Sequence, residues 1–576
     1  MKFASSPVLT LRLPVWRSRL LLLAFFGGFV VLGARAVYLQ GWNNDFLQAK
    51  GESRYSRVIE ITANRGRIVD RHGELLAIST PVKSVWAIPS EVELDKAHAD
   101  RLSALLEVPP QDIQKRIADT NRDFVYIKRQ ISPELADRVA ELRIPGLFQS
   151  REFRRYYPGG EVMSHVLGFT GADDIGQEGV ELAFQDRLAG KAGSRRVIKD
   201  RMGQIIEDLQ SIKSAQEGHD LTLALDARIQ NLVFGQLKAA MEQNRAKAGG
   251  IVVLDITTGE MLALANFPTY NPNNRTHLSG ASLRNRALTD TFEPGSTLKP
   301  FTIATALESG KVTPQTTIQT APGTLTIGKA TIRDAHAEGL LTVHQIIQKS
   351  SNVGSAKVAL SLPAEAMWDT FNAVGFGAAP RLGFPGEAPG KVRAHKTWRP
   401  IEQATMSYGH GIAVSLVQLA RAYSIFARDG DLVPISLVKL DTPPPARQVI
   451  SAETARAVRA MLESAVHPGG TAPRAQIMGY RVAGKTGTAH KLENGHYAPN
   501  KYVSSFVGFA PVSNPRLVVA VMIDEASAGQ YYGGAVAAPV FAKVMEGALR
   551  ALGVPPDAPM KPVVLPPPGQ EVEESI

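Results

Sequence analysis

The sequence contains no cysteine among its 576 residues. This absence excludes a disulfide framework, a thiolate zinc site, an iron–sulfur cluster and a cysteine nucleophile. Any covalent catalysis must therefore use a serine, a threonine, a lysine or a carboxylate. The 12 histidines show no paired spacing with carboxylates of the kind that binds a metal. We therefore expect neither a metal site nor a cofactor.

Acidic residues are also missing from the beginning of the chain, where the first one is Asp45. Five of the ten excess positive charges lie in the first 40 residues, at Lys2, Arg12, Arg17, Arg19 and Arg35. The remaining surplus is spread over the rest of the chain, which is typical of a solvated surface. We therefore expect no nucleic-acid partner. The length predicts two to four domains.

An apolar run covers residues 20–39, with Arg35 as its only charge. Its length is the roughly 20 residues that a helix needs to cross a bilayer. The basic residues before it place the amino terminus in the cytoplasm, so the rest of the chain is exported. A signal peptide cleaved near residues 34–36 is the alternative, but the apolar run resumes beyond that site. We favour an uncleaved anchor at residues 20–40 after a cytoplasmic tail of residues 1–19.

Residues 41–219 are rich in charge, glycine and proline and contain short β-branched runs such as residues 57–61. This texture predicts an elongated module, mainly of strands and loops. A helical insertion is expected near residues 95–145.

Two clusters in this module, residues 65–73 and 176–181, combine glycine with acidic or basic side chains. We interpret them as turns in which ion pairs tie loops together. Glu178 and Glu181 stand three residues apart in a glycine-rich turn, without a defined cleft. They therefore do not predict the acid pair of a glycosidase.

Residues 220–552 predict a compact α/β domain of the α+β type. We expect an antiparallel sheet closed by the two ends of the domain, with a layer of helices inserted between them. The expected strands are residues 251–255, 261–265, 504–509 and 517–523, and the expected helices are residues 297–308, 343–361, 413–428 and 535–552. The proline-rich, acidic tail of residues 553–576 is expected to be extended or disordered.

A first motif places Ser296 three residues before Lys299, directly after a Pro-Gly pair that marks the start of a helix. This spacing puts both side chains on one helix face, where the amine can take a proton from the hydroxyl. A free lysine with a pKa of about 10.4 is neutral in only about one molecule in 2,500 at pH 7. The base role therefore requires burial beside a second cation. By itself, the pair is also compatible with an ordinary helix start.

A second motif consists of Ser350 and Asn352, in a stretch with a helical pattern. A hydroxyl can relay a proton, and an amide both donates and accepts hydrogen bonds. The two residues therefore suit a site that holds a peptide beside a nucleophile. A polar cluster on a helix surface is the alternative.

A third motif consists of Lys485, Thr486 and Gly487, followed by Thr488. Residues 479–486 formally match the phosphate-binding loop of nucleotide hydrolases. That loop works only between a buried strand and the start of a helix. The sequence predicts neither element here, so we do not expect nucleotide binding.

Taken together and in this order, the three motifs resemble those of penicillin-binding proteins and class A β-lactamases, a family of active-site serine acyltransferases. Residues 220–552 carry this resemblance. Residues 65–73 and 176–181 are similar to the pedestal of class B penicillin-binding proteins, which have one membrane anchor and no glycosyltransferase domain. The segments similar to the division-specific branch, penicillin-binding protein 3, are residues 350–354, 479–491 and 531–534.

The resemblance implies a peptidoglycan D,D-transpeptidase of the bacterial inner membrane that works at the division septum from the periplasmic side. Ser296 would attack the carbonyl between the two terminal D-alanines of a stem peptide and form an acyl-enzyme. An amine from a neighbouring strand would then take the acyl group, and β-lactams would acylate the same serine. The implied partners are divisome proteins, including a polytopic glycan polymerase.

The resemblance also implies how protons move and where charge is stabilised. Lys299 would accept the proton of Ser296. Ser350 and Lys485 would relay it to the leaving amine. The backbone N–H groups of Ser296 and Thr488 would form the oxyanion hole.

Substrate-binding roles follow from the same resemblance. Thr486 and Thr488, on either side of Gly487, would hold the terminal carboxylate of the stem peptide. Asn352 would hold a peptide amide.

Hydrolysis of the acyl-enzyme would require a base that activates water. Glu402 is the nearest candidate in the sequence, but it matches no hydrolase motif, and we expect a structural role. We interpret His410 as a loop histidine that lines the cleft. An anchored penicillin-binding sensor or division scaffold without turnover is the alternative from another functional class.

Overall fold

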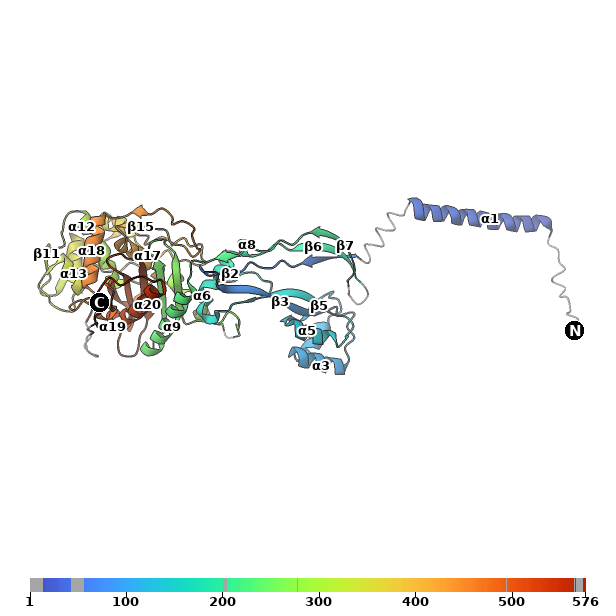
Figure 1. Cartoon of the computed structure of the whole chain (residues 1–576), viewed down its shortest axis with the longest axis horizontal. Helices are drawn as coiled ribbons and strands as arrows, with labels where there is room; N and C mark the ends of the chain where they lie inside the picture. The colour runs from blue at the N-terminus through green and yellow to red at the C-terminus, as the bar shows by residue number, and fades with distance from the viewer. Residues whose placement is uncertain are drawn as a thin grey trace. The chain divides into compact units, whose positions relative to one another are not determined.

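The computed structural model describes residues 14–42, 56–199, 205–276, 278–493, 495–563, 565 and 573–575. The chain forms two compact units (Figure 1). The first consists of Met1–Ala63, Val82–Glu152 and Lys191–Gln216, and the second of Asn64–Pro81, Phe153–Gly190 and Glu217–Ile576. The segments that carry the two glycine-rich clusters therefore belong to the larger, second unit.

Helix α1 (Val15–Val37) continues into a π-helical turn, η2 (Tyr38–Trp42). Val15–Gln40 is the one candidate membrane span among the described residues, and none of its residues is buried against the rest of the chain. The described part of the chain thus has one apolar helix that can serve as a membrane anchor. Of the basic residues that precede the apolar run, Arg17 and Arg19 lie in α1, whereas Lys2 and Arg12 lie outside the described residues.

A three-stranded antiparallel sheet in the first unit has the order β1-β6-β7. Its strands are β1 (Ser56–Ile61), β6 (Gly193–Lys199) and β7 (Ile205–Lys213). The predicted strand at residues 57–61 is confirmed as β1. Because β1 pairs with β6 along its whole length, backbone hydrogen bonds join segments that are far apart in the sequence.

The predicted helical insertion of the first unit is confirmed. It consists of α3 (Lys96–Leu106), α4 (Pro110–Ile117) and α5 (Pro133–Ala140), with strand β4 (Val125–Ile131) between the last two helices. These elements bury a core of their own. The sequence does not predict β4, because polar residues 128–130 interrupt its apolar alternation.

A five-stranded antiparallel sheet forms the centre of the second unit, in the order β10-β9-β19-β18-β17. Its strands are β9 (Ala248–Asp255), β10 (Met261–Phe267), β17 (Ala483–Glu493), β18 (His496–Ala510) and β19 (Leu517–Asp524). Because β9 pairs with β19, the two ends of the domain close the sheet, as predicted. Strand β17 was not expected, because its glycines and threonines are typical of a loop.

Successive residues of the central strands face two separate cores. In β9, Ile251 and Val253 pack into one core, whereas Val252 and Leu254 pack into the other. A strand alternates its side chains between the two faces of a sheet. The continuous apolar run of β9 therefore follows from helices covering both faces.

Helices of the second unit divide between these two cores (Figure 1). One face of the sheet is covered by α9 (Ala227–Asn244) and α20 (Ala538–Ala551), the latter after a short α19 (Gly533–Val536). The helices on the other side are α12 (Lys299–Glu308), α13 (Val343–Lys349), α14 (Asn352–Leu360), α15 (Ala364–Ala373), α16 (Pro400–Met406), α17 (Leu416–Ala427) and α18 (Ala452–Ser464).

The single helix predicted at residues 343–361 is wrong, because the chain breaks between α13 and α14. Ser350 ends α13 with a φ of 59°, in the left-handed region. Ser351 then starts α14, and its side chain accepts a hydrogen bond from Gly354 N. A left-handed residue followed by a new N-cap ends one helix and begins another.

The other described elements complete the two units. The strands are β2 (Ile68–Val69), β3 (Leu75–Ala87), β5 (Leu147–Tyr156), β8 (Leu221–Thr222), β11 (Thr317–Gln319), β12 (Thr324–Ile327), β13 (Ala330–Arg333), β14 (Leu340–Thr342), β15 (Asp431–Leu432) and β16 (Arg447–Gln448). The helical turns are η3 (Gly160–Val162), α6 (Ser164–Leu167), α7 (Gly179–Ala183), α8 (Gln185–Leu188), α10 (Gly280–Leu283), α11 (Arg286–Thr289), η4 (Gly295–Leu298), η5 (His395–Thr397) and η6 (Pro473–Ala475).

Buried ion pairs join the two glycine-rich clusters. Glu181 lies between Arg65 and Arg155, and its two carboxylate oxygens each accept a hydrogen bond of 2.7 Å from one Nε atom. All three side chains are at most 1% exposed. The interpretation of these clusters as turns tied by ion pairs is confirmed, and Glu181 is not available as a glycosidase acid.

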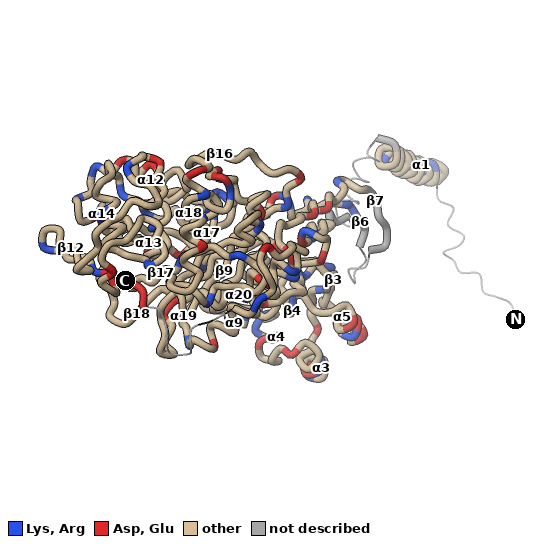
Figure 2. Tube along the Cα trace, turned by 60° about the vertical axis from the view of Figure 1, so that its left-hand side comes forward, with Lys and Arg blue, Asp and Glu red and all other residues tan. Residues whose placement is uncertain are grey.

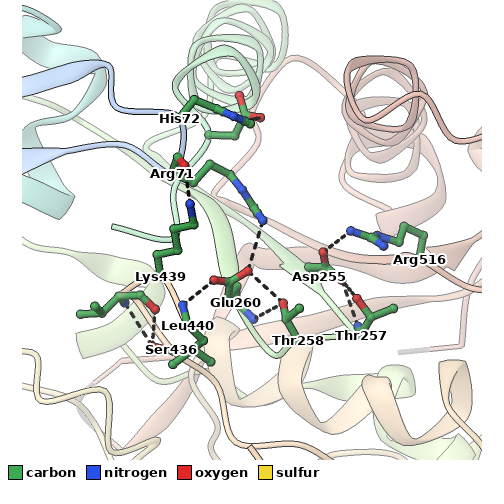
Figure 3. A network of polar contacts seen from close by, with 12 residues as sticks. Arg71, His72, Asp255, Thr257, Thr258, Glu260, Ser436, Lys439, Leu440 and Arg516 are labelled. Atoms are coloured by element: carbon green, nitrogen blue, oxygen red, sulfur yellow. Dashed lines mark hydrogen bonds and ion pairs between the residues drawn. The ribbon is translucent and has the colours of Figure 1, made fainter. Parts of the chain in front are cut away.

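Arg71, in the first cluster, reaches the turn between β9 and β10 (Figure 3). Its Nη2 lies 3.3 Å from Glu260 Oε2, and Glu260 Oε1 accepts a hydrogen bond of 2.8 Å from Leu440 N. At the other end of the turn, Asp255 Oδ2 lies 2.6 Å from Arg516 Nη2. These contacts give the first cluster a structural role beside the central sheet.

Charged residues of both signs are intermixed along the chain (Figure 2). Several basic side chains of the second unit are paired, for example Arg428 with Asp431 and Arg481 with Glu463. This mixture differs from the one-sided basic surface that is typical of nucleic-acid binding.

Replacing Glu181 by glutamine is expected to destabilise the second unit. The change leaves two buried guanidinium groups without their counter-ion, and breaking a buried pair in this way costs about 3–5 kcal/mol. Urea unfolding of the full chain measures this as a transition at lower urea concentration. The control is Glu178→Gln, the same change on a partly exposed side chain of the same turn. Equal midpoints for the two variants would contradict the structural role of Glu181.

Candidate active site

Ser296 lies in the turn η4, which leads directly into α12. The side chain is 3% exposed. Gly295 precedes it with a φ of 57°, and a Cβ atom there would lie 3.2 Å from Thr488 O. Glycine is therefore required at this position for two reasons, the left-handed backbone and the close approach of β17. The turn carries the serine to the edge of the sheet, beside the third motif.

Lys299 is fully buried in the first turn of α12. Its Nζ lies 2.8 Å from Ser296 Oγ, 2.6 Å from Ser350 O and 3.0 Å from Ser350 Oγ. Burial and then the positive charge of Lys485 lower the pKa of Lys299 well below its usual value. This is the environment that the base role requires.

The three contacts of Lys299 match the hydrogen-bonding capacity of a neutral amine. A neutral amine has two N–H donors and one lone pair. The two oxygen atoms of Ser350 can accept the two donors, which leaves the lone pair for the hydroxyl proton of Ser296. The first two motifs are thus brought together as one hydrogen-bonded group.

Asp334 holds the second motif in place. Its Oδ2 accepts a hydrogen bond of 2.6 Å from Ser351 Oγ, and its Oδ1 accepts one of 2.9 Å from Val353 N. The carboxylate therefore lies at the amino terminus of α14, where negative charge is favoured. It fixes the turn that positions Ser350 and Asn352.

Asn352 has an unpaired acceptor in the site. Its Nδ2 donates a hydrogen bond of 3.3 Å to Arg333 O. Its Oδ1 is buried and has no hydrogen-bond partner among the described residues. A buried polar atom without a partner is rare in a native structure and usually marks a functional position.

Lys485 is also fully buried, on strand β17. Its Nζ donates to Thr486 O at 3.3 Å and to Thr486 Oγ1 at 3.2 Å. Burial lowers the pKa of Lys485 to about 8, while the negative charge of Glu574 opposes this lowering. The hydrogen bonds of the described residues include none between Lys485 and Ser350. The expected relay role of Lys485 therefore stays a prediction. Its positive charge acts on Lys299 by lowering the pKa of that amine.

Thr486 and Thr488 present their hydroxyl groups on the same strand. Thr486 Oγ1 lies 3.0 Å from Thr471 Oγ1. Thr488 Oγ1 donates a hydrogen bond of 2.9 Å to Glu574 Oε2 and accepts one of 2.9 Å from Gly533 N. Thr471 could not be predicted, because no distinguishing pattern surrounds it in the sequence.

Gly487, between the two threonines, packs closely against the nucleophile turn. An added Cβ would lie 2.7 Å from Pro294 O and 2.9 Å from Thr297 Cγ2. A larger residue would therefore push β17 away from Ser296. Gly487 thus allows the close approach of β17 to this turn, and its expected substrate-binding role stays a prediction.

Residues 479–486 do not form a phosphate-binding loop. The segment leads into β17, which continues to Glu493, and no helix starts after Thr486. The motif therefore lacks the helix amino terminus that binds phosphate.

Glu402 has the contacts of a structural residue, whereas His410 lies in a loop, as expected, and its place in the cleft stays a prediction. Glu402 accepts hydrogen bonds from Arg399 N and the guanidinium of Arg393, and these contacts lower its pKa to about 2. Burial, followed by the charges of His490 and Lys299, lowers the pKa of His410 to about 4. Among the described residues, no group of three or more His, Asp or Glu side chains can hold a metal ion.

Comparisons with known proteins agree with this geometry. Residues 249–546 match the family of the penicillin-binding protein transpeptidase domain, and residues 60–223 match the penicillin-binding protein dimerisation domain. The chain is 44% identical over 536 residues to the probable peptidoglycan D,D-transpeptidase PenA of Neisseria gonorrhoeae, covering 92% of each chain. It is 42% identical over 550 residues to the peptidoglycan D,D-transpeptidase FtsI of Escherichia coli (strain K12), covering 94% of this chain and 93% of FtsI.

A solved structure adds the same evidence for the fold. The apo structure of the TP domain from Burkholderia pseudomallei penicillin-binding protein 3 is 49% identical and matches with a TM-score of 0.55. It covers 58% of this chain and 98% of that domain. The chain therefore belongs to the penicillin-binding proteins, with the transpeptidase and dimerisation domains of that family.

Proposed function

We propose that this chain is a peptidoglycan D,D-transpeptidase in which Ser296 attacks the carbonyl between the two terminal D-alanines of a stem peptide. The observation that carries this proposal is the buried amine of Lys299, 2.8 Å from Ser296 Oγ. Because burial and Lys485 lower its pKa, Lys299 can take the serine proton as the new C–O bond forms. The identity with two named D,D-transpeptidases supports the reaction type.

The proton then moves to the nitrogen of the leaving D-alanine. Ser350 Oγ lies 3.0 Å from Lys299 Nζ. It can accept a proton from the ammonium group and donate its own to the leaving amine. Lys485 adds positive charge beside this path, which favours transfer of the proton away from Lys299.

The oxyanion of the tetrahedral intermediate would be held by the N–H groups of Ser296 and Thr488. The close packing of Gly295 on the Thr488 backbone brings these two segments together. Each such donor contributes about 10²–10³-fold to the rate in enzymes of this kind.

The substrate would lie along β17. The hydroxyl groups of Thr486 and Thr488, with the charge of Lys485, suit its terminal carboxylate. The unpaired Oδ1 of Asn352 suits a peptide N–H. The terminal carboxylate and one peptide N–H of the substrate would thus meet complementary groups of the protein.

Transfer to an amine is favoured over hydrolysis. An attacking amine of a neighbouring strand would displace Ser296 and form the cross-link. Glu402, the nearest candidate base for water activation, is bound to Arg399 and Arg393.

The setting of the reaction follows from the apolar helix and the family. Residues 20–40 would anchor the chain in the inner membrane, with residues 1–19 in the cytoplasm, and the rest would work in the periplasm at the division septum. Residues 41–219 would form the pedestal, residues 220–552 the transpeptidase domain and residues 553–576 the tail. β-Lactams would acylate Ser296, and divisome proteins with a polytopic glycan polymerase would be partners.

Labelled penicillin is expected to form a stable covalent adduct with the full chain, and Ser296→Ala is expected to abolish it. Removal of a catalytic nucleophile lowers turnover by about 10³-fold or more. The control is Ser309→Ala, the same change at the exposed end of α12. Gel fluorescence measures the adduct, and intact labelling of the Ser296 variant would contradict the assignment. Labelling without cross-linking of stem peptides supplied with an acyl acceptor would indicate the sensor instead.

Acylation is expected to slow as the pH rises through about 8. Lys485 has a pKa of about 8, so above this pH it loses the charge that attracts the substrate carboxylate. Lys485→Arg keeps the charge at high pH, because arginine remains protonated, and is expected to remove the alkaline decrease. The second-order acylation rate constant measured against pH tests this. An alkaline decrease at the same pH in both proteins would exclude Lys485 as its cause.

Asp334→Asn is expected to lower the acylation rate constant about ten-fold without preventing folding, because an amide cannot accept both hydrogen bonds that hold the second motif. The loss should appear in the acylation step rather than in the initial binding of the β-lactam, since Asp334 acts through Ser350 and Asn352. The control is Glu338→Gln, which removes a nearby charge that is paired with Lys349. Equal rates for the two variants would show that Asp334 does not position the motif.

A further inference from the structure

Two residues near the end of the chain, Glu574 and Ser575, contact the active site. Glu574 Oε2 accepts a hydrogen bond of 2.9 Å from Thr488 Oγ1, and its Oε1 accepts one of 2.8 Å from Gly534 N. Ser575 Oγ accepts a hydrogen bond of 2.9 Å from Ala335 N. Glu574 is 4% exposed and Ser575 is 8% exposed. These two side chains are therefore enclosed by the site.

The carboxylate of Glu574 also complements the charge of the site. Lys299 and Lys485 are both fully buried there. The negative charge of Glu574 stabilises the protonated forms of both lysines. The carboxylate of Glu574 thus meets the Thr488 hydroxyl, the Gly534 N–H and buried positive charge. Two hydrogen-bond donors beside a positive charge are the surroundings that stabilise a carboxylate.

The hydroxyl of Thr488 and the charge of Lys485 are groups that the proposed function assigns to the terminal carboxylate of the stem peptide, so the inference rests on that function. We infer that the tail is an intramolecular competitor of the substrate, in which Glu574 occupies the carboxylate subsite formed by Thr488 and Lys485. A stem peptide or a β-lactam with its own carboxylate binds only after the tail has left.

A second set of contacts attaches the base of the tail to the segment that leads into β17. Asp557 Oδ1 accepts a hydrogen bond of 2.7 Å from Arg481 N, and Tyr480 OH donates one of 2.7 Å to Val554 O. Arg481 stands two residues before the start of β17. The base of the tail is therefore attached just before the strand that carries Thr488, a hydrogen-bond partner of Glu574.

The tether makes the competition intramolecular. From Val563 to Glu573 the chain spans at most about 35 Å. A short linker between two bound segments gives an effective concentration in the millimolar range. Even a weak carboxylate ligand at that concentration occupies a large share of the sites. The apparent affinity for substrate is then the intrinsic affinity multiplied by the fraction of sites that the tail leaves open.

The test compares acylation rates of variants of the full chain in detergent. Glu574→Gln removes the charge that enters the site and is expected to raise the second-order rate constant with a fluorescent penicillin by about two-fold or more, which corresponds to a site that is at least half closed. The matched control is Glu573→Gln, the same change on the exposed neighbouring residue, and it is expected to match the wild-type rate. Equal rate constants for the two variants would overturn the inference.

Hydrogen exchange gives a second measurement that does not depend on acylation. The amide of Gly534 donates to Glu574, so it is expected to exchange faster in Glu574→Gln than in Glu573→Gln. The comparison is repeated in the Ser296→Ala background. A failure of acylation in every chain that keeps Ser296 would contradict the proposed function, whereas unchanged exchange at Gly534 would overturn the tail inference.

A separate peptide with the sequence of the tail tests whether the Glu574 carboxylate is the group that the carboxylate subsite binds. A synthetic peptide of residues 565–576 is expected to slow acylation of the Glu574→Gln chain in proportion to its concentration. The same peptide with glutamine at position 574 is expected to have no effect. Equal inhibition by both peptides would show that the Glu574 carboxylate is not what the site binds.

Discussion

The burial of two lysine side chains within one site is the constraint on which the rest of the catalytic domain depends. Lys299 and Lys485 are both removed from water, and two unpaired cations in such surroundings would be costly. The protein relieves this cost by lowering the pKa of Lys299, whose lone pair then faces Ser296. The same desolvation that would destabilise an ordinary core thus produces the base that the reaction needs.

Much of the surrounding architecture serves this arrangement. The left-handed turn at Ser350 directs both its carbonyl and its hydroxyl oxygen to one amine. Asp334 holds the start of α14 that carries the motif. Glycines at 295 and 487 let the nucleophile turn and β17 approach more closely than side chains would allow. The nucleophile turn, the turn at Ser350 and strand β17 are distant in the sequence, and these features hold all three around the Nζ atom of Lys299.

The motifs and the outline of the sheet could be predicted from the sequence, because spacing and apolar runs are local signals. The break at Ser350 could not, since residues 343–361 have a helical pattern and the turn is stabilised by the distant Lys299. Strand β17 was missed because its glycines and threonines form a strand only through pairing with β18. Asp334 and Glu574 were missed because each acts on a partner far away in the sequence.

The pairing of β9 with β19 has a consequence for how the enzyme is made. Strand β9 pairs on one side with β10, which follows it directly, but its partner on the other side, β19 (Leu517–Asp524), lies more than 260 positions later. Ser296 and Lys299 emerge from the ribosome long before that partner, and a chain folds its domains as units. In an unfinished chain, Ser296 and Lys299 are therefore present but not yet buried. The serine becomes reactive only after β19 has been synthesised and has paired with β9.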